Sequence, residues 1–283
     1  MRRGRPSVTD PMADEPSTPE TPDSTPAGEP SGVPSSPRVP NSPGLPAPAE
    51  APAGSGHPAA GPRAHVTHVL MGLIGAVFLL QYIPALGLLE RFGFMPALAA
   101  EQPWRMLTHA FIHSQPSPLH VGFNLLALFF FGSFLERAIG HVRFAVLYVL
   151  GALGGAVCVL VLADPTSPAS WFALHVGASG AVFALVGALL TPTRELDRNL
   201  GGVLALVALN AAIPLVEPNI SWESHLGGLI TGFLLGCAAL LPPPRRRPLV
   251  FGVAALLMVA VLAGLTVLKL LAVASLPPAL STF

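Results

Sequence analysis

Charged side chains are scarce in this sequence, because Asp, Glu, Lys and Arg together make up only 11% of its 283 residues. The formal net charge is zero, so the composition gives no electrostatic basis for nucleic-acid binding. Cysteine is also rare: Cys158 and Cys237 both fall in apolar runs, where a thiol is ordinarily a small buried hydrophobe rather than half of a disulfide or a metal ligand. Hydrophobic residues make up 52% of the chain and the mean hydropathy is +0.62, which is typical of a protein that crosses a membrane several times.

The chain divides by composition into three parts. Residues 1–64 hold half of the 32 prolines and almost no large apolar side chains, so we expect a disordered cytoplasmic tail. Residues 65–241 are predicted to form an all-α membrane domain, and residues 242–283 a basic linker and a further membrane helix. The apolar segments that predict the seven helices are 66–86, 119–136, 144–163, 179–191, 200–216, 223–241 and 249–273. The interruption at 87–118 is expected to lie on or in the outer membrane interface.

The placement of basic residues predicts the topology. With a cytoplasmic N-terminus, twelve of the fifteen Lys and Arg residues fall on the cytoplasmic side, leaving Arg91, Arg105 and Lys269 outside. The same topology puts the three tryptophans near the outer interface, which suits their amphipathic rings. We therefore expect a multi-pass protein of the plasma (inner) membrane, with its N-terminus inside and its C-terminus outside.

Two polar residues begin apolar segments that enter the membrane from the same side. Ser179 starts the fourth segment and His225 lies at the start of the sixth, so the two side chains can meet. The fourth segment is short, which predicts that Ser179 lies about 10 Å below the outer boundary of the hydrocarbon core. A hydroxyl beside an imidazole at this depth makes proteolysis within the bilayer the leading functional hypothesis.

Small residues recur every four positions in the same two segments. The sixth segment carries Gly228, Gly232 and Gly236, and the fourth carries Gly180, Ala184 and Ala188. Such strips let two helices approach closely, and this contact would aim His225 at Ser179. The alternative interpretation is that glycine and alanine are simply common in this chain.

His120 and Asn124 lie one turn apart near the start of the second segment. An imidazole and an amide that project inward there, together with the backbone N–H of Ser179, can donate hydrogen bonds to a developing oxyanion. The alternative is that the pair only links helices through hydrogen bonds.

The remaining histidines call for a separate interpretation. His109, His113 and His120 lie close together in sequence, and the first two have an i, i+4 spacing that can bind a metal on a helix. No Asp, Glu or Cys accompanies them at ligand spacing, so structural or cavity-lining roles are expected and no metal site or cofactor is predicted. His141 and His175 are expected to be exposed in loops.

Taken together, these motifs resemble the rhomboid intramembrane serine proteases over about residues 66–241. The motifs that carry the resemblance are Trp104-Arg105, His120 to Asn124, Gly177-Ala-Ser179-Gly180, Ser224-His225-Leu-Gly-Gly228 followed by Gly232, and a GxxxExxxG pattern at Gly132, Glu136 and Gly140.

The resemblance implies a six-helix catalytic core, here followed by a seventh helix, that needs no cofactor. It implies a Ser179–His225 dyad without an acidic third member, an acyl-enzyme intermediate, and transmembrane proteins in the lipid bilayer as substrates. Glu217 and Glu223 precede His225 and can in principle orient it, although solvated loop charges fit them better.

Other motif positions are expected to support the site. The resemblance gives Gly177, Gly180 and Phe183 roles in positioning substrate or base, and Arg105 and Glu136 are expected to brace loop and helix ends. Phe183 stands where familiar bacterial members often carry Tyr, but a phenyl ring can still stack on the His225 imidazole. Residues 114–118 look longer than the corresponding loop of those members.

Two other function classes remain open from the sequence. The first is a catalytically inactive rhomboid-like protein that binds or escorts membrane clients, for which an intact Ser179 and His225 would be unnecessary. The second is a channel or transporter that uses His120 and Asn124 along a polar path, whose flux would survive the loss of Ser179.

Overall fold

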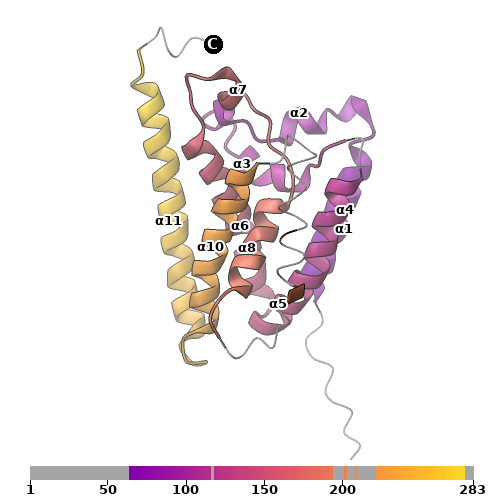
Figure 1. Ribbon diagram of the computed structural model, residues 1–283, viewed down its shortest axis with the longest axis vertical. Coiled ribbons are helices and arrows are strands. Elements are labelled where there is room, and N and C mark those ends of the chain that lie inside the picture. Colours follow the sequence, from indigo (N-terminus) through magenta and orange to yellow (C-terminus); the bar gives the residue numbers. More distant parts are fainter. Residues whose placement is uncertain (1–63, 116–117, 194–200, 203–207, 209–220, 278–283) are drawn as a thin grey trace, which may run out of the picture. The chain divides into compact units, whose positions relative to one another are not determined.

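The computed structural model describes residues 64–115, 118–193, 201–202, 208 and 221–277 (Figure 1). These residues all belong to one of the two units into which the chain divides, Gly56–Phe283. Within them the secondary structure is helical, apart from an isolated backbone bridge between Phe94 and His175. The predicted tail at 1–64 and the predicted helix at 200–216 lie almost wholly outside the described residues.

Six of the seven predicted apolar segments are helical in the structure, which confirms the all-α membrane fold. They are α1 (His65–Leu80), α4 (Leu119–Ala127) continued by the π-helical η4 (Leu128–Gly132) and by α5 (Ser133–Ile139), α6 (His141–Leu162), α8 (Ser179–Leu189), α10 (Trp222–Leu240) and α11 (Arg247–Ala274). Four described helices, counting α4 to α5 as one, are long and apolar enough to cross a membrane. The fourth segment, α8, has only 11 residues and is too short to do so by itself.

The first helix ends earlier than its apolar composition predicts. Helix α1 stops at Leu80, whereas the prediction extended to residue 86, and the chain bends by 105° into η1 (Pro84–Leu86) and α2 (Leu88–Phe92). Pro84 has no N–H to continue an α-helix and restricts the residue before it, so the helix is interrupted there.

The long interruption at 87–118 contains more regular structure than was predicted. After α2 come η2 (Pro96–Leu98), α3 (Arg105–Thr108) and η3 (His109–Phe111). The buried guanidinium of Arg105 donates hydrogen bonds to the carbonyl of Gly93 at 2.7 Å and to Oε1 of Gln102 at 2.5 Å. This segment and α7 (Pro168–Trp171) lie at the end of the helices where α8 and α10 begin (Figure 1).

Helices α8 and α10 pack through glycine in a parallel arrangement. A Cβ on Gly228 would lie 2.0 Å from the carbonyl oxygen of Gly180, and one on Gly232 would lie 1.9 Å from that of Ala184. Because both members of each pair advance by four residues in the same direction, the two helices run parallel. Every residue of α8 is buried, so this helix forms the centre of the bundle.

Helix α6 closes the third side of this core in an antiparallel arrangement. A Cβ on Gly151 would lie 2.2 Å from that of Ala184, and one on Gly155 would lie 2.6 Å from the hydroxyl of Ser224. Because glycine lies at the contact points of all three helix pairs, α6, α8 and α10 approach one another more closely than larger side chains would allow.

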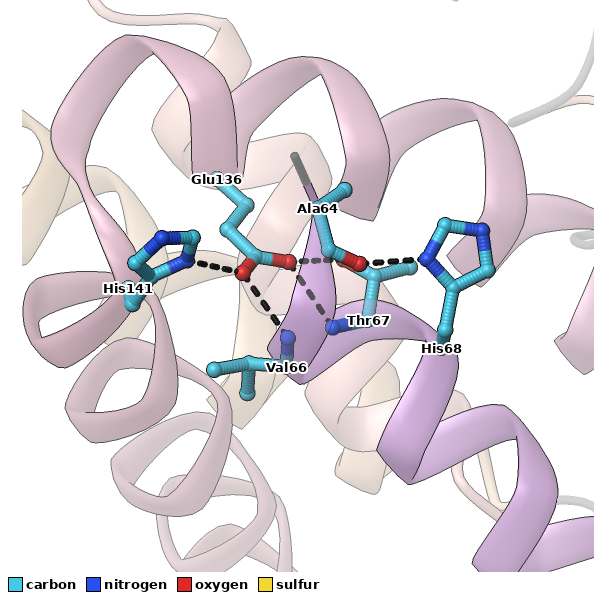
Figure 2. A network of polar contacts seen from close by, with 6 residues as sticks. All are labelled: Ala64, Val66, Thr67, His68, Glu136 and His141. Atoms are coloured by element: carbon cyan, nitrogen blue, oxygen red, sulfur yellow. Dashed lines mark hydrogen bonds and ion pairs between the residues drawn. The ribbon is translucent and has the colours of Figure 1, made fainter. Parts of the chain in front are cut away.

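At the opposite end, Glu136 of α5 caps the first turn of α1 (Figure 2). Its carboxylate accepts the backbone N–H groups of Val66 and Thr67, each at 2.8 Å, and the hydroxyl of Thr67 at 2.6 Å. Nδ1 of His141 donates to the same carboxylate, which gives this histidine a partner that the sequence interpretation had not assigned. The N-cap residue of α1, Ala64, has no side-chain acceptor. A carboxylate from another helix instead accepts hydrogen bonds from these N–H groups, and its negative charge interacts favourably with the helix dipole.

Helix α11 lies along α6 and α10 (Figure 1). Phe251 is the only one of its residues that is buried, and most of the others are exposed. Nζ of Lys269 donates to the carbonyls of Val161 and Ala163 at the end of α6, at 3.0 and 2.6 Å. At the other end of α11, Arg247 donates to the carbonyl of Pro242. Both contacts satisfy carbonyls that a helix end or a turn leaves unpaired.

Candidate active site

Ser179 is the first residue of α8 and lies at the start of the glycine-packed core. Its side chain is nearly buried, with 8% exposed. The turn before it depends on Gly177, whose φ of +118° is rarely adopted by residues with a side chain. A Cβ on Gly177 would also lie 2.7 Å from Nε2 of His120 and 3.8 Å from the hydroxyl oxygen of Ser179. The hydroxyl of Ser179 and the ring of His120 therefore border the same point beside Gly177.

His225 lies on α10 with its ring held flat against Phe183 of α8. The ring centroids are 4.1 Å apart and the planes are inclined by 9°, so the stacking expected from the sequence is present. Phe183 follows Ser179 by one turn on the same face of α8, which places the imidazole beside the face that carries the hydroxyl. Nε2 of His225 is buried and has no hydrogen-bond partner within the described part of the chain.

The alignment of α8 with α10 shows how far Ser179 lies from the end of the bundle at which α10 begins. Gly180 lies against Gly228, which is six residues after the first residue of α10, Trp222. At about 1.5 Å of rise per residue, Gly180 lies roughly 9 Å, and Ser179 roughly 7.5 Å, farther along the bundle axis than that first residue. His225 is 7% exposed, so the described residues cover both groups almost completely.

His120 and Asn124 lie inward on α4, and each side chain is 1% exposed. The backbone N–H of Ser114 donates to Nδ1 of His120 at 3.5 Å, and the Ser114 hydroxyl lies 3.3 Å from the same atom. A neutral ring that accepts at Nδ1 carries its proton on Nε2, and Nε2 has no hydrogen-bond partner among the described residues. Nδ2 of Asn124 donates one of its two hydrogens to the carbonyl of His120 at 2.9 Å.

The sequence interpretation did not connect His113 with the serine turn. This fully buried side chain accepts the backbone N–H of Ala178 at Nε2, at 3.4 Å, and its ring centroid is 5.1 Å from that of His120. The described residues contain no group of three His, Cys, Asp or Glu side chains arranged to hold a metal ion. The i, i+4 spacing of His109 and His113 gives no sign of the contact with Ala178, which joins residues 65 positions apart.

Two more histidines lie near the same turn. The carbonyl of His109 accepts the backbone N–H of Gly177 at 3.0 Å. The ring of His109 is buried, and burial lowers the pKa of His109 to about 4. His175 was expected to be exposed, but its backbone exchanges two hydrogen bonds with Phe94 and its side chain is partly buried, which lowers its pKa. The prediction of an exposed His175 was wrong because the chain folds back on the 87–118 segment.

The other motif residues surround this centre. Gly180 faces the hydroxyl of Ser224, which a Cβ would approach to 2.7 Å. Trp104 precedes α3 and is half exposed. Glu223 accepts the Ser221 hydroxyl at the start of α10 at 2.5 Å, and no carboxylate among the described residues bonds to His225. Glu217 lies outside the described residues.

The fold is a helical membrane bundle, and two of its parallel, glycine-packed helices carry a buried serine and a buried histidine. These features place the chain among helical membrane proteins with a candidate hydrolytic dyad. The rhomboid domain model matches residues 100–242, about half of the chain, and this range includes Ser179, His225, His120 and Asn124. The chain belongs to the rhomboid family.

Individual relatives agree with this assignment. RHOMBOID-like protein 6, mitochondrial, of Arabidopsis thaliana is 30% identical over 173 residues, which cover 56% of this chain and 52% of that protein. YdcA of Bacillus subtilis is 30% identical over 159 residues, covering 54% of this chain and 76% of YdcA. The rhomboid protease GluP of the same bacterium is 31% identical over 150 residues, which cover 51% of this chain and 28% of GluP. The chain spans about half the length of the Arabidopsis relatives it matches.

Proposed function

We propose that this protein is an intramembrane serine endopeptidase in which Ser179 is the nucleophile and His225 the general base. The observation that carries the proposal is the placement of Ser179 and Phe183 on one face of α8, with the His225 ring stacked on Phe183 and its Nε2 buried without a partner. A base nitrogen left without a partner in a buried site costs stability, and groups that carry such a cost are concentrated at functional sites. An acceptor nitrogen held free in this way is suited to take the proton of a neighbouring hydroxyl.

The reaction proceeds in two steps. In the first, Nε2 of His225 takes the proton of the Ser179 hydroxyl as the oxygen attacks the scissile carbonyl, and the imidazolium then gives that proton to the departing amine. An ester joins Ser179 to the acyl part of the substrate. In the second, His225 deprotonates a water molecule that attacks this ester, and the proton returns to Ser179 as the acid product leaves.

Charge on the carbonyl oxygen is stabilised by donors on two helices. His120 offers its Nε2–H, which lies beside Gly177 and has no partner among the described residues. Asn124 has a second amide hydrogen, and Ser179 contributes its backbone N–H, because the first N–H groups of a helix have no intrahelical acceptor. Donors fixed in advance in a buried site stabilise an oxyanion more strongly than water does.

We assign the substrates to the transmembrane segments of other membrane proteins. A helical substrate hides its carbonyls in hydrogen bonds, so cleavage should favour segments with small or helix-breaking residues that unwind readily. We place the protein in the plasma membrane with its N-terminus in the cytoplasm and its C-terminus outside, on the distribution of its basic residues.

The test is cleavage of a transmembrane reporter by the purified, detergent-solubilised full chain. Wild type should release product, and Ser179→Ala and His225→Ala should each lower the rate by at least about a thousandfold, as loss of a nucleophile or its base does in serine hydrolases. Thermal melting checks that both variants fold.

Labelling of Ser179 with a fluorophosphonate complements the cleavage assay, because it reports an activated serine without a chosen substrate. Wild type that is neither cleaving nor labelled would contradict the proposal and favour a client-binding role. Equal product from all three proteins would exclude the dyad.

A further inference from the structure

The turn that precedes Ser179 has no side-chain cap of its own. Ala178 is the N-cap residue of α8 and is fully buried, so its backbone N–H needs an acceptor from elsewhere in the fold. That acceptor is Nε2 of His113, at 3.4 Å. The contact fixes the Gly177–Ala178 peptide group, one residue before the nucleophile.

His113 is also coupled to His120. The two rings meet edge to face, with centroids 5.1 Å apart and planes inclined by 62°. The next residue, Ser114, contacts Nδ1 of His120 with both its backbone N–H and its hydroxyl. The pair His113 and Ser114 thus touches both the serine turn and the ring that offers its Nε2–H beside that turn.

The backbone of His113 is itself anchored by Gln81, directly after α1. Nε2 of Gln81 donates to the carbonyl of His113 at 2.8 Å, and the N–H of His113 donates to Oε1 of Gln81 at 3.0 Å. The side-chain amide therefore pairs with the peptide groups on both sides of His113 in the manner of two paired strands. These two hydrogen bonds fix the backbone of residues 113 and 114 relative to the end of α1.

The buried ring of His113 stays neutral at physiological pH. Burial lowers the pKa of His113 to about 3, with a further contribution from the neighbouring His120. A neutral imidazole keeps one ring nitrogen as an acceptor, so the contact with the Ala178 N–H persists over the working range of pH.

We propose that His113 is a positioning residue that holds the Ala178–Ser179 turn and the His120 ring in register, and that Gln81 anchors it. The proposal rests on the proposed function, since it assigns a role in presenting the nucleophile to the oxyanion donors. His113 does not touch the reacting atoms in this scheme and acts through Ala178 and His120.

The test compares two substitutions of the same residue in the full chain. His113→Gln keeps an acceptor close to the position of Nε2, whereas His113→Phe keeps the ring volume and removes the acceptor. Hydrogen–deuterium exchange of the segment containing Ala178 should be about fivefold faster in His113→Phe and close to wild type in His113→Gln, because one hydrogen bond of net strength near 1 kcal/mol is lost. This readout does not depend on catalysis.

Kinetics on the transmembrane reporter provide the second readout. In His113→Phe, kcat should fall by about ten- to a hundredfold with KM within about twofold of wild type, since a displaced nucleophile costs orientation and not substrate binding. His113→Gln should recover most of that loss. His65→Phe, at an exposed histidine of α1, is the matched control and should keep wild-type kcat.

A second variant covers the case in which His113→Phe does not fold. Gln81→Met removes both hydrogen bonds to the His113 backbone and should lower kcat in the same direction. Unchanged exchange at Ala178, or equal kcat for His113→Phe, His113→Gln and wild type, would overturn the role of His113 while leaving the proposed function intact. A wild type that neither cleaves the reporter nor takes the fluorophosphonate overturns the proposed function, and the positioning role with it.

Discussion

Phe183 and His225 face each other across two parallel helices with their rings stacked 4.1 Å apart. The helix that carries the candidate nucleophile therefore also holds the candidate base. Because Phe183 has no hydroxyl, it orients the imidazole by ring contact alone. Any change that tilts α8 against α10 would move the serine and the histidine relative to each other.

Removal of the aromatic ring should weaken this alignment. Phe183→Leu fills part of the space without a flat surface, so we expect kcat on a transmembrane reporter to fall about fivefold with little change in KM, because an aromatic pair contributes about 1 kcal/mol. Phe183→Tyr preserves the ring and should stay within a few fold of wild type. Phe130→Leu, at a largely exposed phenylalanine, is the control. A wild-type kcat for Phe183→Leu would refute the positioning role of the stack.

The close approach of α8 and α10 should tolerate no side chain at Gly232. A Cβ there would lie 1.9 Å from the carbonyl of Ala184, so Gly232→Ala must push the helices apart. We expect a loss of about 1–3 kcal/mol in the free energy of unfolding, seen as a lower melting temperature, together with reduced cleavage. Gly264→Ala on α11 meets nothing within 4 Å and should be neutral or slightly stabilising. Equal melting temperatures for both variants would argue against this packing.

The carboxylate of Glu136 should stabilise the protein without affecting the chemistry. Gln at position 136 replaces one acceptor oxygen by an NH₂ group, which leaves a buried donor of Val66 or Thr67 unsatisfied. The expected cost is about 1–3 kcal/mol in the free energy of unfolding, measured by denaturant titration. Glu101→Gln, at an exposed position, is the control. At a temperature where Glu136→Gln is folded, fluorophosphonate labelling of Ser179 should match wild type, and a slower rate would indicate that the cap also shapes the site.

Stability should fall in mild acid because buried histidines resist protonation. In the unfolded chain His109 and His113 titrate near their ordinary value of 6.5, whereas burial lowers their folded pKa values to about 4 and about 3. The unfolded state therefore binds more protons below about pH 6.5, so the free energy of unfolding decreases as the pH falls from about 6.5 towards 4 and is unaffected by these groups above about 7.

The contribution of His109 alone is about 3 kcal/mol at the acid end, since each pKa unit corresponds to about 1.4 kcal/mol. Melting curves collected between pH 7.5 and pH 4.5 would measure it. His109→Phe removes the proton uptake and should show a shallower decline than wild type. Parallel declines would show that His109 does not remain neutral in the folded state.

Periodic and compositional patterns predicted the membrane helices well. Stretches of apolar residues identify α6, α8, α10 and α11 to within a few residues, because the requirement to bury backbone polar groups in lipid forces helix formation. The glycine and alanine strips likewise predicted the contact of Gly228 and Gly232 with α8. These features depend on residues that are neighbours on one helix face, which a sequence displays directly.

Contacts between loops could not be predicted in this way. The bond from Ala178 to His113 and the pairing of Gln81 with His113 join segments that are distant in sequence, and no periodicity reports which loop folds over which. Glu136 was expected to brace a helix end, but its partners Val66 and Thr67 precede it by about seventy residues. Their choice follows from how α1 and α5 pack.

The bridge between Phe94 and His175 is made by backbone atoms alone, with both residues donating and accepting. Any residue except proline can form the same pair of bonds, so this backbone link between the 87–118 segment and the residues before Ser179 does not itself depend on which side chains the two positions carry. The side chains are constrained for a different reason, because Phe94 is fully buried and its ring centroid lies 6.4 Å from that of His175. The 87–118 segment is thus joined to the residues around Ser179 in two ways: through backbone bonds that do not depend on residue identity, and through the His113 side chain, which requires an acceptor at that position.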